Sequence, residues 1–113
     1  MEENYKLYRV RELADGDEGF VNAIAAAFLE EVPEDAARLK KAVGERDYYT
    51  TYQAAHKMKP TIDLFELGVL EELIIVQDWG KEEKKGEDVS KQLKLLLAAI
   101  ERASEEIKSD FNL

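Results

Sequence analysis

Apolar residues recur along most of the chain at spacings of three and four, which is the period of an amphipathic helix. Five of them predict a short N-terminal helix: Tyr5, Leu7, Tyr8, Val10 and Leu13. The segment 14–17, which contains two aspartates and a glycine, ends that helix. Asp17 then predicts the start of a second helix, because an aspartate side chain accepts hydrogen bonds from the free N–H groups of a first turn.

The second helix is predicted from the apolar stripe Phe20, Ile24, Ala27 and Phe28. Pro33 either kinks this helix or opens a new one, since proline suits a first turn but removes a hydrogen bond from a helix interior. The helical spacing continues beyond the proline in both cases, so the chain stays helical here.

Gly44 predicts the end of this stretch, because glycine adopts the left-handed cap conformation without strain. Asp47 is placed to cap the next helix. The apolar stripe of that helix has six members: Tyr48, Tyr52, Ala55, Met58, Ile62 and Phe65. Leu67-Gly68 then predicts a tight turn or a kink.

A fourth helix is predicted from Leu70 to Trp79-Gly80, and the polar segment 81–88 predicts an exposed loop. The last helix is predicted from about Val89 to Ile107, with the stripe Leu93, Leu96, Leu97, Ile100, Ala103 and Ile107. The sequence shows no strand-like alternation, hairpin turn or fixed repeat.

Short loops make sequential helices pack antiparallel. We therefore expect an all-α fold, an up-and-down antiparallel four-helix bundle with a short extra N-terminal helix. Its 113 residues suit one domain, residues 1–113 with a core of about 17–108.

The composition is that of a globular protein, with 45% apolar and 36% charged residues. The chain has no cysteine, which excludes disulfides, thiolate zinc sites, iron–sulfur clusters and a cysteine nucleophile. Its first residues do not resemble a signal peptide, and its apolar runs are too short to span a bilayer. We expect a cytoplasmic protein.

A net charge of −9 leaves no cationic footprint for nucleic acid and disfavours anionic membrane surfaces, so we expect neither as a partner. The acidic positions Glu30-Glu31 and Glu34-Asp35 are most simply a solvated helix face. Di-iron bundles need Glu-x-x-His pairs on two helices, and one histidine cannot supply them. We expect no metal and no cofactor.

His56 is the only histidine of the chain. It lies one position from the predicted apolar stripe, so we expect its imidazole at the rim, between core and solvent. Its side-chain neighbours at three and four residues are Tyr52, Gln53, Lys59 and Pro60. An imidazole there is able to react with a group outside the protein.

Lys59 lies one turn after His56 on the same face, whereas Lys57 points elsewhere around the helix. Residues 56–63 hold two lysines and one aspartate, a local positive patch on an acidic chain. A phosphoryl group on the imidazole would carry close to two negative charges and would need such a cation. Pro60 removes the usual partner of the His56 carbonyl, so we expect it to loosen or bend the helix and to help a partner dock.

The string His56-Lys57-Met58-Lys59-Pro60 resembles the motif of histidine-containing phosphotransfer (HPt) domains of two-component phosphorelays. That motif is a histidine, any residue, a hydrophobic residue, a lysine and usually a glycine. Ala54-Ala55, Phe28-Leu29, Leu39 and Asp47 are also similar to the family, and the resemblance covers roughly residues 7–108. Two positions depart from the pattern: Pro60 replaces the usual glycine, and Glu66 falls where many members have a second one, although Gly68 follows closely.

The resemblance implies a phosphoprotein of two-component signal transduction. His56 would accept a phosphoryl group from an aspartyl phosphate on a response-regulator receiver domain and pass it to another receiver. Lys59 would stabilise the phosphohistidine. The partners would be receiver domains and a hybrid sensor kinase, and the domain would be a monomer. The chain has no nucleotide-binding loop of its own, so it would be a phosphocarrier without kinase activity.

A hairpin at Leu67-Gly68 would place residue 56 across from about residue 78. Gln77 or Asp78 would then hold the nearer ring nitrogen and fix the tautomer, and Trp79 would wall the site.

Two other functions compete with phosphotransfer. A non-catalytic helical adaptor, a degenerate HPt-like domain, would bind a receiver without taking phosphate, and Pro60 and Glu66 favour it. A metal-dependent bundle enzyme lacks its ligands. Tyr48, Tyr49 and Tyr52 are interpreted as packing rather than as a binding platform.

Overall fold

The computed structural model describes residues 4–113, and all regular structure in that range is helical. The helices are α1 (Tyr8–Ala14), α2 (Glu18–Gly44), α3 (Tyr48–Leu64), α4 (Leu70–Lys81) and α5 (Ser90–Asp110). The described residues contain no strand, so the all-α prediction is confirmed for them. No helix in residues 4–113 combines the length and apolarity needed to cross a membrane.

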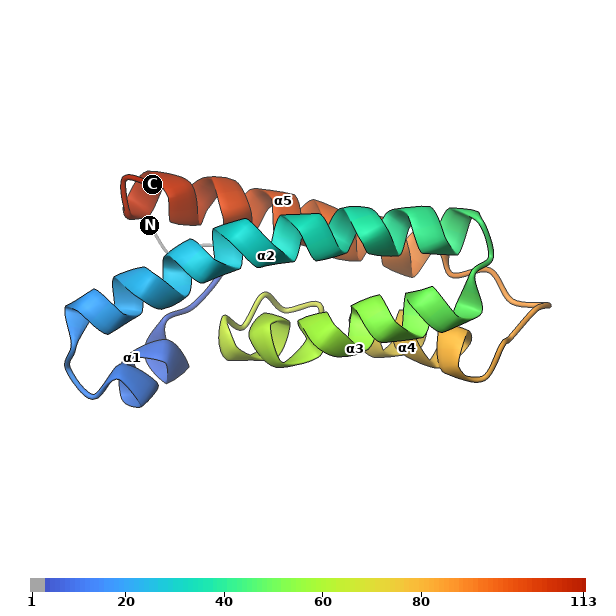
Figure 1. The fold of residues 1–113 in the computed structure, drawn as a ribbon, viewed down its shortest axis with the longest axis horizontal. Coiled ribbons are helices and arrows are strands. Elements are labelled where there is room, and N and C mark those ends of the chain that lie inside the picture. Colours follow the sequence, from blue (N-terminus) through green and yellow to red (C-terminus); the bar gives the residue numbers. More distant parts are fainter. Residues whose placement is uncertain (1–3) are drawn as a thin grey trace.

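The helices form an elongated body with extents of 47 × 22 × 19 Å. Figure 1 shows α2 lying along α5, with α3 and α4 side by side below them, and α1 near the start of α2. α3 contacts both α2 and α4, while α5 contacts α2 and α4. The candidate histidine therefore lies on a helix that has neighbours on two sides.

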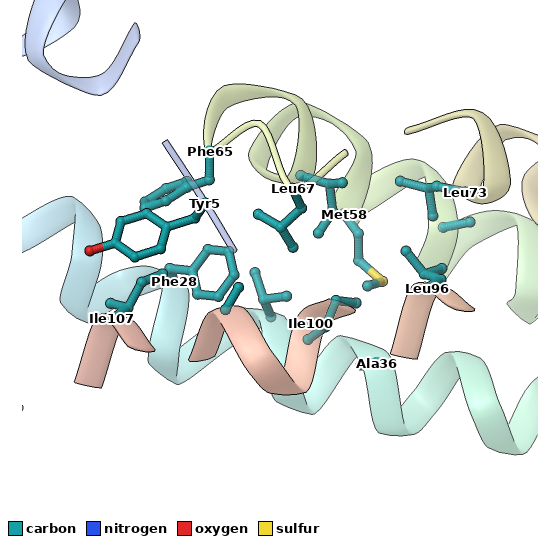
Figure 2. Packing of buried hydrophobic residues seen from close by; sticks show 14 of the residues in the cluster. Tyr5, Phe28, Ala36, Met58, Phe65, Leu67, Leu73, Leu96, Ile100 and Ile107 are labelled. Atoms are coloured by element: carbon teal, nitrogen blue, oxygen red, sulfur yellow. The ribbon is translucent and has the colours of Figure 1, made fainter. Parts of the chain in front are cut away.

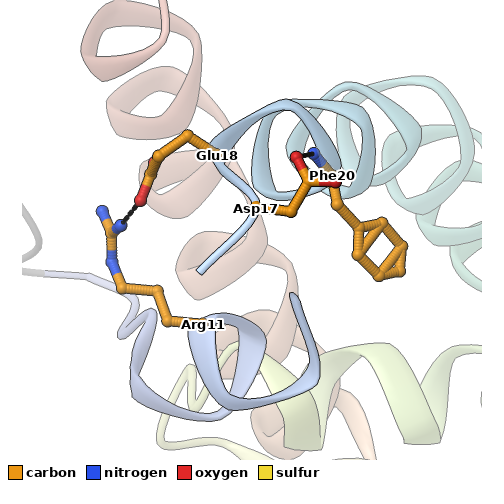
Figure 3. Close-up of polar contacts among 4 residues, drawn as sticks. All are labelled: Arg11, Asp17, Glu18 and Phe20. Atoms are coloured by element: carbon orange, nitrogen blue, oxygen red, sulfur yellow. Dashed lines mark hydrogen bonds and ion pairs between the residues drawn. The ribbon is translucent and has the colours of Figure 1, made fainter. Parts of the chain in front are cut away.

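Aspartate side chains begin α2 and α3, as predicted. Asp17 Oδ1 accepts a hydrogen bond from the Phe20 amide at 3.1 Å, which Figure 3 shows beside the ion pair between Arg11 and Glu18. Asp47 Oδ1 likewise accepts from the Thr50 amide at 3.1 Å. Each carboxylate satisfies a backbone donor that the first turn leaves without a helical partner.

The helix ends differ from the prediction in one respect. Gly44 is the last residue of α2, but the left-handed residue is Arg46, with φ +55°. The Asp47 amide donates to the Ala42 carbonyl and the Arg46 amide to the Val43 carbonyl, which is a Schellman motif. Gly44 thus lies two residues before Arg46, the position where a left-handed backbone conformation would favour glycine.

The same motif ends three further helices. The left-handed residue is Glu66 after α3 (φ +50°), Glu83 after α4 (+49°) and Asn112 after α5 (+54°). In each case the amide of the following residue donates to the carbonyl five residues earlier, as Leu67 does to the Ile62 carbonyl at 3.4 Å. The Leu67-Gly68 turn predicted between α3 and α4 is confirmed, with Gly68 at φ +79°.

Pro33 lies inside α2, which runs without interruption from Glu18 to Gly44. The alternative in which Pro33 opens a separate helix is therefore wrong. The predicted stripe of α2 is correct at Phe28, which is buried, but wrong at Phe20, which is 41% exposed, and Ile24 and Ala27 are only half-buried. The buried face of α2 holds Val21, Ala25, Phe28, Val32, Asp35, Ala36, Leu39 and Ala42.

The core runs along the body, and Figure 2 shows part of it. The rings of Phe28 and Phe65 meet at a centroid distance of 4.7 Å, and the ring of Tyr5 lies 6.4 Å from that of Phe65. Met58, Leu73 and further buried side chains continue this cluster. Tyr5 belongs to it although it precedes the predicted core of residues 17–108.

The predicted stripes of the later helices are largely confirmed. In α3 the stripe is buried from Ala55 onward, whereas Tyr48 and Tyr52 are half-buried at the rim. In α5 the stripe is buried at Leu96, Ile100, Ala103 and Ile107 and half-buried at Leu93 and Leu97. The rim position of Tyr52 matters because its ring faces the candidate histidine.

Candidate functional site

His56 lies in the middle of α3 with its side chain exposed, as predicted. Ala54 and Ala55 on the same turn are fully buried, so the backbone at this point is fixed against the core. The imidazole stacks on the ring of Tyr52, with a centroid distance of 5.4 Å and an interplanar angle of 23°. The Tyr52 ring therefore lies beside the imidazole and roughly parallel to it, and the His56 side chain as a whole remains accessible.

Lys59 lies one helical turn after His56 and is half-buried. Within residues 4–113 its ammonium makes no ion pair or hydrogen bond. A lysine side chain four carbons long is able to move its charge over several ångströms. Lys59 is therefore free to meet an anion on the imidazole.

Lys57 is already paired. Its Nζ lies 3.1 Å from Oδ1 of Asp35 on α2. Asp35 is 7% exposed, which corrects its predicted place on a solvated face, although Glu30, Glu31 and Glu34 are exposed as expected. Because Lys57 compensates a buried carboxylate, it is a structural residue of the α2–α3 interface in this arrangement.

Gln77 and Asp78 do not hold the ring nitrogen in this structure. Gln77 is 8% exposed, and its Oε1 is buried without a hydrogen-bond partner among the described residues. Asp78 is half-buried, and in residues 4–113 no hydrogen bond joins either residue to His56. The physical reason for Gln77 is its place on the core-facing side of α4, with Leu73 and Val76.

Trp79 has a different role from the predicted wall of the site. Its ring packs against Tyr48 at a centroid distance of 4.6 Å, and its Nε1 donates to the Glu87 carbonyl at 2.9 Å. Tyr48 precedes His56 by about two helical turns, roughly 12 Å along the axis. Trp79 thus anchors the loop that follows α4 instead of enclosing the imidazole.

Pro60 is exposed and lies inside α3, which continues to Leu64. Proline has no N–H, so the carbonyl of His56 lacks its usual helical donor. This leaves one backbone acceptor of α3, one turn before the proline, without a helical donor.

Sequence reasoning missed three features near the site. Asp35 belongs to the buried face of α2, and its spacing from Val32 and Leu39 carries that signal. Gly80 is a second, since a Cβ there would lie 2.7 Å from the Tyr48 carbonyl oxygen and 2.8 Å from the Tyr52 amide nitrogen. Absence of a side chain at this point lets α4 approach the backbone of α3 closely.

The third feature is a chain of hydrogen bonds on the surface of α2 and α3. Arg38 donates to Gln53 Oε1 at 3.2 Å, and Gln53 Nε2 donates to the Tyr49 hydroxyl at 2.9 Å. All three side chains are exposed, and Gln53 lies one turn before His56. No sequence signal links these residues, because the contact between Arg38 and Gln53 joins two helices.

The site as a whole consists of an exposed imidazole, an aromatic ring beside it and, one turn away, an ammonium that has no partner among the described residues. Among residues 4–113, no three histidine, cysteine, aspartate or glutamate side chains are grouped so as to hold a metal ion. Comparison with known proteins identifies no relative: no protein-family model, no curated protein and no solved structure matches the chain.

Proposed function

We propose that this protein is a histidine phosphotransfer domain of a two-component phosphorelay. His56 takes a phosphoryl group from an aspartyl phosphate of one receiver domain and passes it to the aspartate of another. The observation that carries the proposal is the exposed His56 with Lys59 one turn away, its ammonium unpaired among the described residues. The resemblance of residues 56–60 to the HPt motif supports the same function.

The chemistry needs little from this chain beyond position and charge. The free lone pair of the imidazole attacks phosphorus, a P–N bond forms, and the bond from phosphorus to the aspartyl oxygen breaks with release of the carboxylate. The reverse sequence of bonds phosphorylates the next receiver. Lys59 balances part of the charge on the phosphoryl group, and the magnesium ion belongs to the receiver.

The proposal includes the architecture of the domain. α2, α3, α4 and α5 form an up-and-down antiparallel four-helix bundle, to which α1 is added at one end. The short connection 45–47 between α2 and α3 and the connection 65–69 between α3 and α4 support antiparallel neighbours. The domain acts as a cytoplasmic monomer and a phosphocarrier, with receiver domains and a hybrid sensor kinase as its partners.

The decisive experiment offers a panel of phosphorylated receiver domains to the wild type and to His56→Gln. We expect an acid-labile, base-stable label on the wild type alone. A matched control, Gln53→His with His56→Gln, moves the single histidine one turn along the same exposed face of α3. Because the label depends on the place of the imidazole beside Lys59, this control is expected to remain unlabelled.

The adaptor function is the alternative, and the exposed Pro60 next to the site favours it. The proline ring occupies surface that a glycine would leave open for the phosphoryl group and the partner. Absence of label from every receiver, together with receiver binding in calorimetry, would establish the adaptor and contradict phosphotransfer.

A further inference from the structure

Among residues 4–113, the stack of His56 on Tyr52 is the contact that orients the candidate imidazole. The ring centroids lie 5.4 Å apart with an interplanar angle of 23°, while no hydrogen bond to the His56 imidazole is present in that range. A lone histidine on an exposed helix face samples its side-chain rotamers freely, on a scale of picoseconds to nanoseconds. An adjacent aromatic ring reduces that freedom, because it stabilises the histidine rotamer in which the two ring faces are in contact.

The backbone that carries Tyr52 is packed against the rest of the domain. Tyr52 is half-buried, and its turn of α3 includes Thr51, which is fully buried and donates from Oγ1 to the Asp47 carbonyl at 2.8 Å. Gly80 of α4 packs against the same turn, since a Cβ there would lie 2.8 Å from the Tyr52 amide nitrogen and 3.2 Å from the Thr51 Cβ. The backbone at Tyr52 is thus fixed against α4, and this fixes the point from which the Tyr52 side chain extends toward the imidazole.

The side chains that would orient the imidazole by a hydrogen bond are directed elsewhere. Gln77 turns its amide oxygen into the protein interior, and Lys57 is paired with Asp35. Lys59 and Pro60 lie on the other side of His56 along the helix, so the Tyr52 ring and the Lys59 ammonium flank the imidazole along α3.

We propose that Tyr52 is the positioning residue of His56, and that its ring, not its hydroxyl, presents the imidazole to a phosphoryl donor. This inference rests on the proposed phosphotransfer function. In this proposal the orientation of the imidazole is set by an aromatic stack, not by a hydrogen bond to the nearer ring nitrogen. Tyr52 touches neither the phosphoryl group nor its donor in this scheme, so its effect is exerted entirely through His56.

The first test measures the imidazole without any partner. NMR relaxation of the His56 ring Cε1–H group gives its order parameter, and ring-current shifts report the Tyr52 face above it. We expect Tyr52→Leu to lower the order parameter and abolish the ring-current shift, whereas Tyr52→Phe preserves both. Tyr49→Leu is the matched control, since Tyr49 is 70% exposed on the same helix and makes no ring contact with His56.

The second test measures the rate of label transfer from a phosphorylated receiver. We expect Tyr52→Leu to slow transfer about three- to tenfold, the range that the strength of an aromatic pair implies. Tyr52→Phe should transfer within about twofold of the wild type by the same reasoning, because it keeps the ring. Thermal unfolding of each variant confirms that the compared domains are folded.

The two readouts separate failure of the inference from failure of the proposed function. An unchanged order parameter and unchanged transfer rate in folded Tyr52→Leu overturn the role of Tyr52, whatever the wild type does with phosphate. Equal loss in Tyr52→Phe and Tyr52→Leu also overturns it, because the hydroxyl would then be the active group. A third outcome is that the wild type takes no label, while the His56 order parameter falls in Tyr52→Leu and not in Tyr52→Phe. This outcome contradicts phosphotransfer and leaves the positioning role of Tyr52 intact.

Discussion

The ammonium of Lys57 on α3 lies 3.1 Å from Oδ1 of Asp35 on α2, and this ion pair joins the two helices one residue from His56. The exposed fractions of the two side chains are unequal, at 56% for Lys57 and 10% for Asp35. The pair therefore compensates a carboxylate inside the interface with an ammonium that still contacts water. The pair lies beside the candidate site, where Lys59, in contrast to Lys57, has no ion-pair partner among the described residues.

Removing the lysine alone should destabilise the domain. Lys57→Met leaves the Asp35 carboxylate in a buried site without its partner, and we expect the free energy of unfolding to fall by about 1–3 kcal/mol. In the double variant Asp35→Leu with Lys57→Met, two apolar side chains meet at the interface, so the loss should be smaller than the sum of the single losses. Urea unfolding of the wild type, the two single variants Lys57→Met and Asp35→Leu, and the double variant measures the coupling energy between the two side chains. Strict additivity of the losses would mean that the ion pair contributes nothing to stability.

Gly80 offers a test of how closely α3 and α4 pack. Gly80→Ala places a Cβ 2.7 Å from the Tyr48 carbonyl oxygen, a backbone atom that cannot rotate away. We expect a loss of about 1–3 kcal/mol, the usual cost of overpacking. Gly44→Ala is the matched control at a helix end, because a Cβ there meets nothing within 4 Å. Equal stability of the two variants in urea unfolding would show that the helices separate at little cost.

The Schellman motif after α3 predicts a stabilising substitution. Glu66 adopts φ +50°, where a Cβ costs about 1–2 kcal/mol, and glycine avoids that strain while losing more chain entropy. We expect Glu66→Gly to raise the free energy of unfolding, by up to about 1 kcal/mol after that entropy cost. Gly68→Ala, at φ +79°, is the converse substitution in the same turn and should lower it. A lower thermal midpoint for Glu66→Gly would contradict this description of the turn.

The N-cap of α3 should contribute a pH dependence. Hydrogen bonds from the Thr50 amide and side chain hold the pKa of Asp47 below its ordinary value. A depressed folded pKa stabilises the fold above the unfolded pKa, and that contribution is lost as pH falls through the folded pKa. Thermal unfolding should therefore show Asp47→Ala below the wild type near neutral pH, with the gap between the two narrowing as the pH falls below about 4. Asp47→Asn keeps the cap without titrating, so a gap between Asn and Ala should persist in acid.

The helices were predictable because their signals are local. The Asp17 and Asp47 caps and the Leu67-Gly68 turn each depend on neighbours in sequence. The buried face of α2 was not, since apolar residues occur on two adjacent stripes of that helix. Which stripe is buried depends on α3 and α5 packing against it, and that choice exposes Phe20 and buries Val21.

The candidate site likewise has some features that local sequence signals predict and others that only tertiary packing determines. The exposed His56 with Lys59 one turn on follows from helical spacing within α3. The partners of Asp35 and Trp79 do not, because one contact joins two helices and the other reaches into the loop after α4. Gln77 shows most clearly where sequence-based prediction fails. The predicted hairpin at Leu67-Gly68 puts Gln77 opposite α3, but the Gln77 side chain is buried in the core.

The two lysines that follow His56 in the sequence, Lys57 and Lys59, should differ clearly in their effect on function. Lys59→Ala removes the ammonium that is unpaired among the described residues, and the loss of a charge-assisted hydrogen bond should slow label transfer to His56 about 10- to 100-fold. Lys57→Ala changes the net charge equally, but its ammonium is engaged with Asp35, so we expect a transfer rate within about twofold of the wild type together with a lower unfolding midpoint. Single-turnover transfer from one phosphorylated receiver, with urea unfolding of both variants, measures the contrast. A larger effect of Lys57→Ala on the rate would show that Lys57 leaves Asp35 for the phosphoryl group, and the assignment of the two lysines would then be reversed.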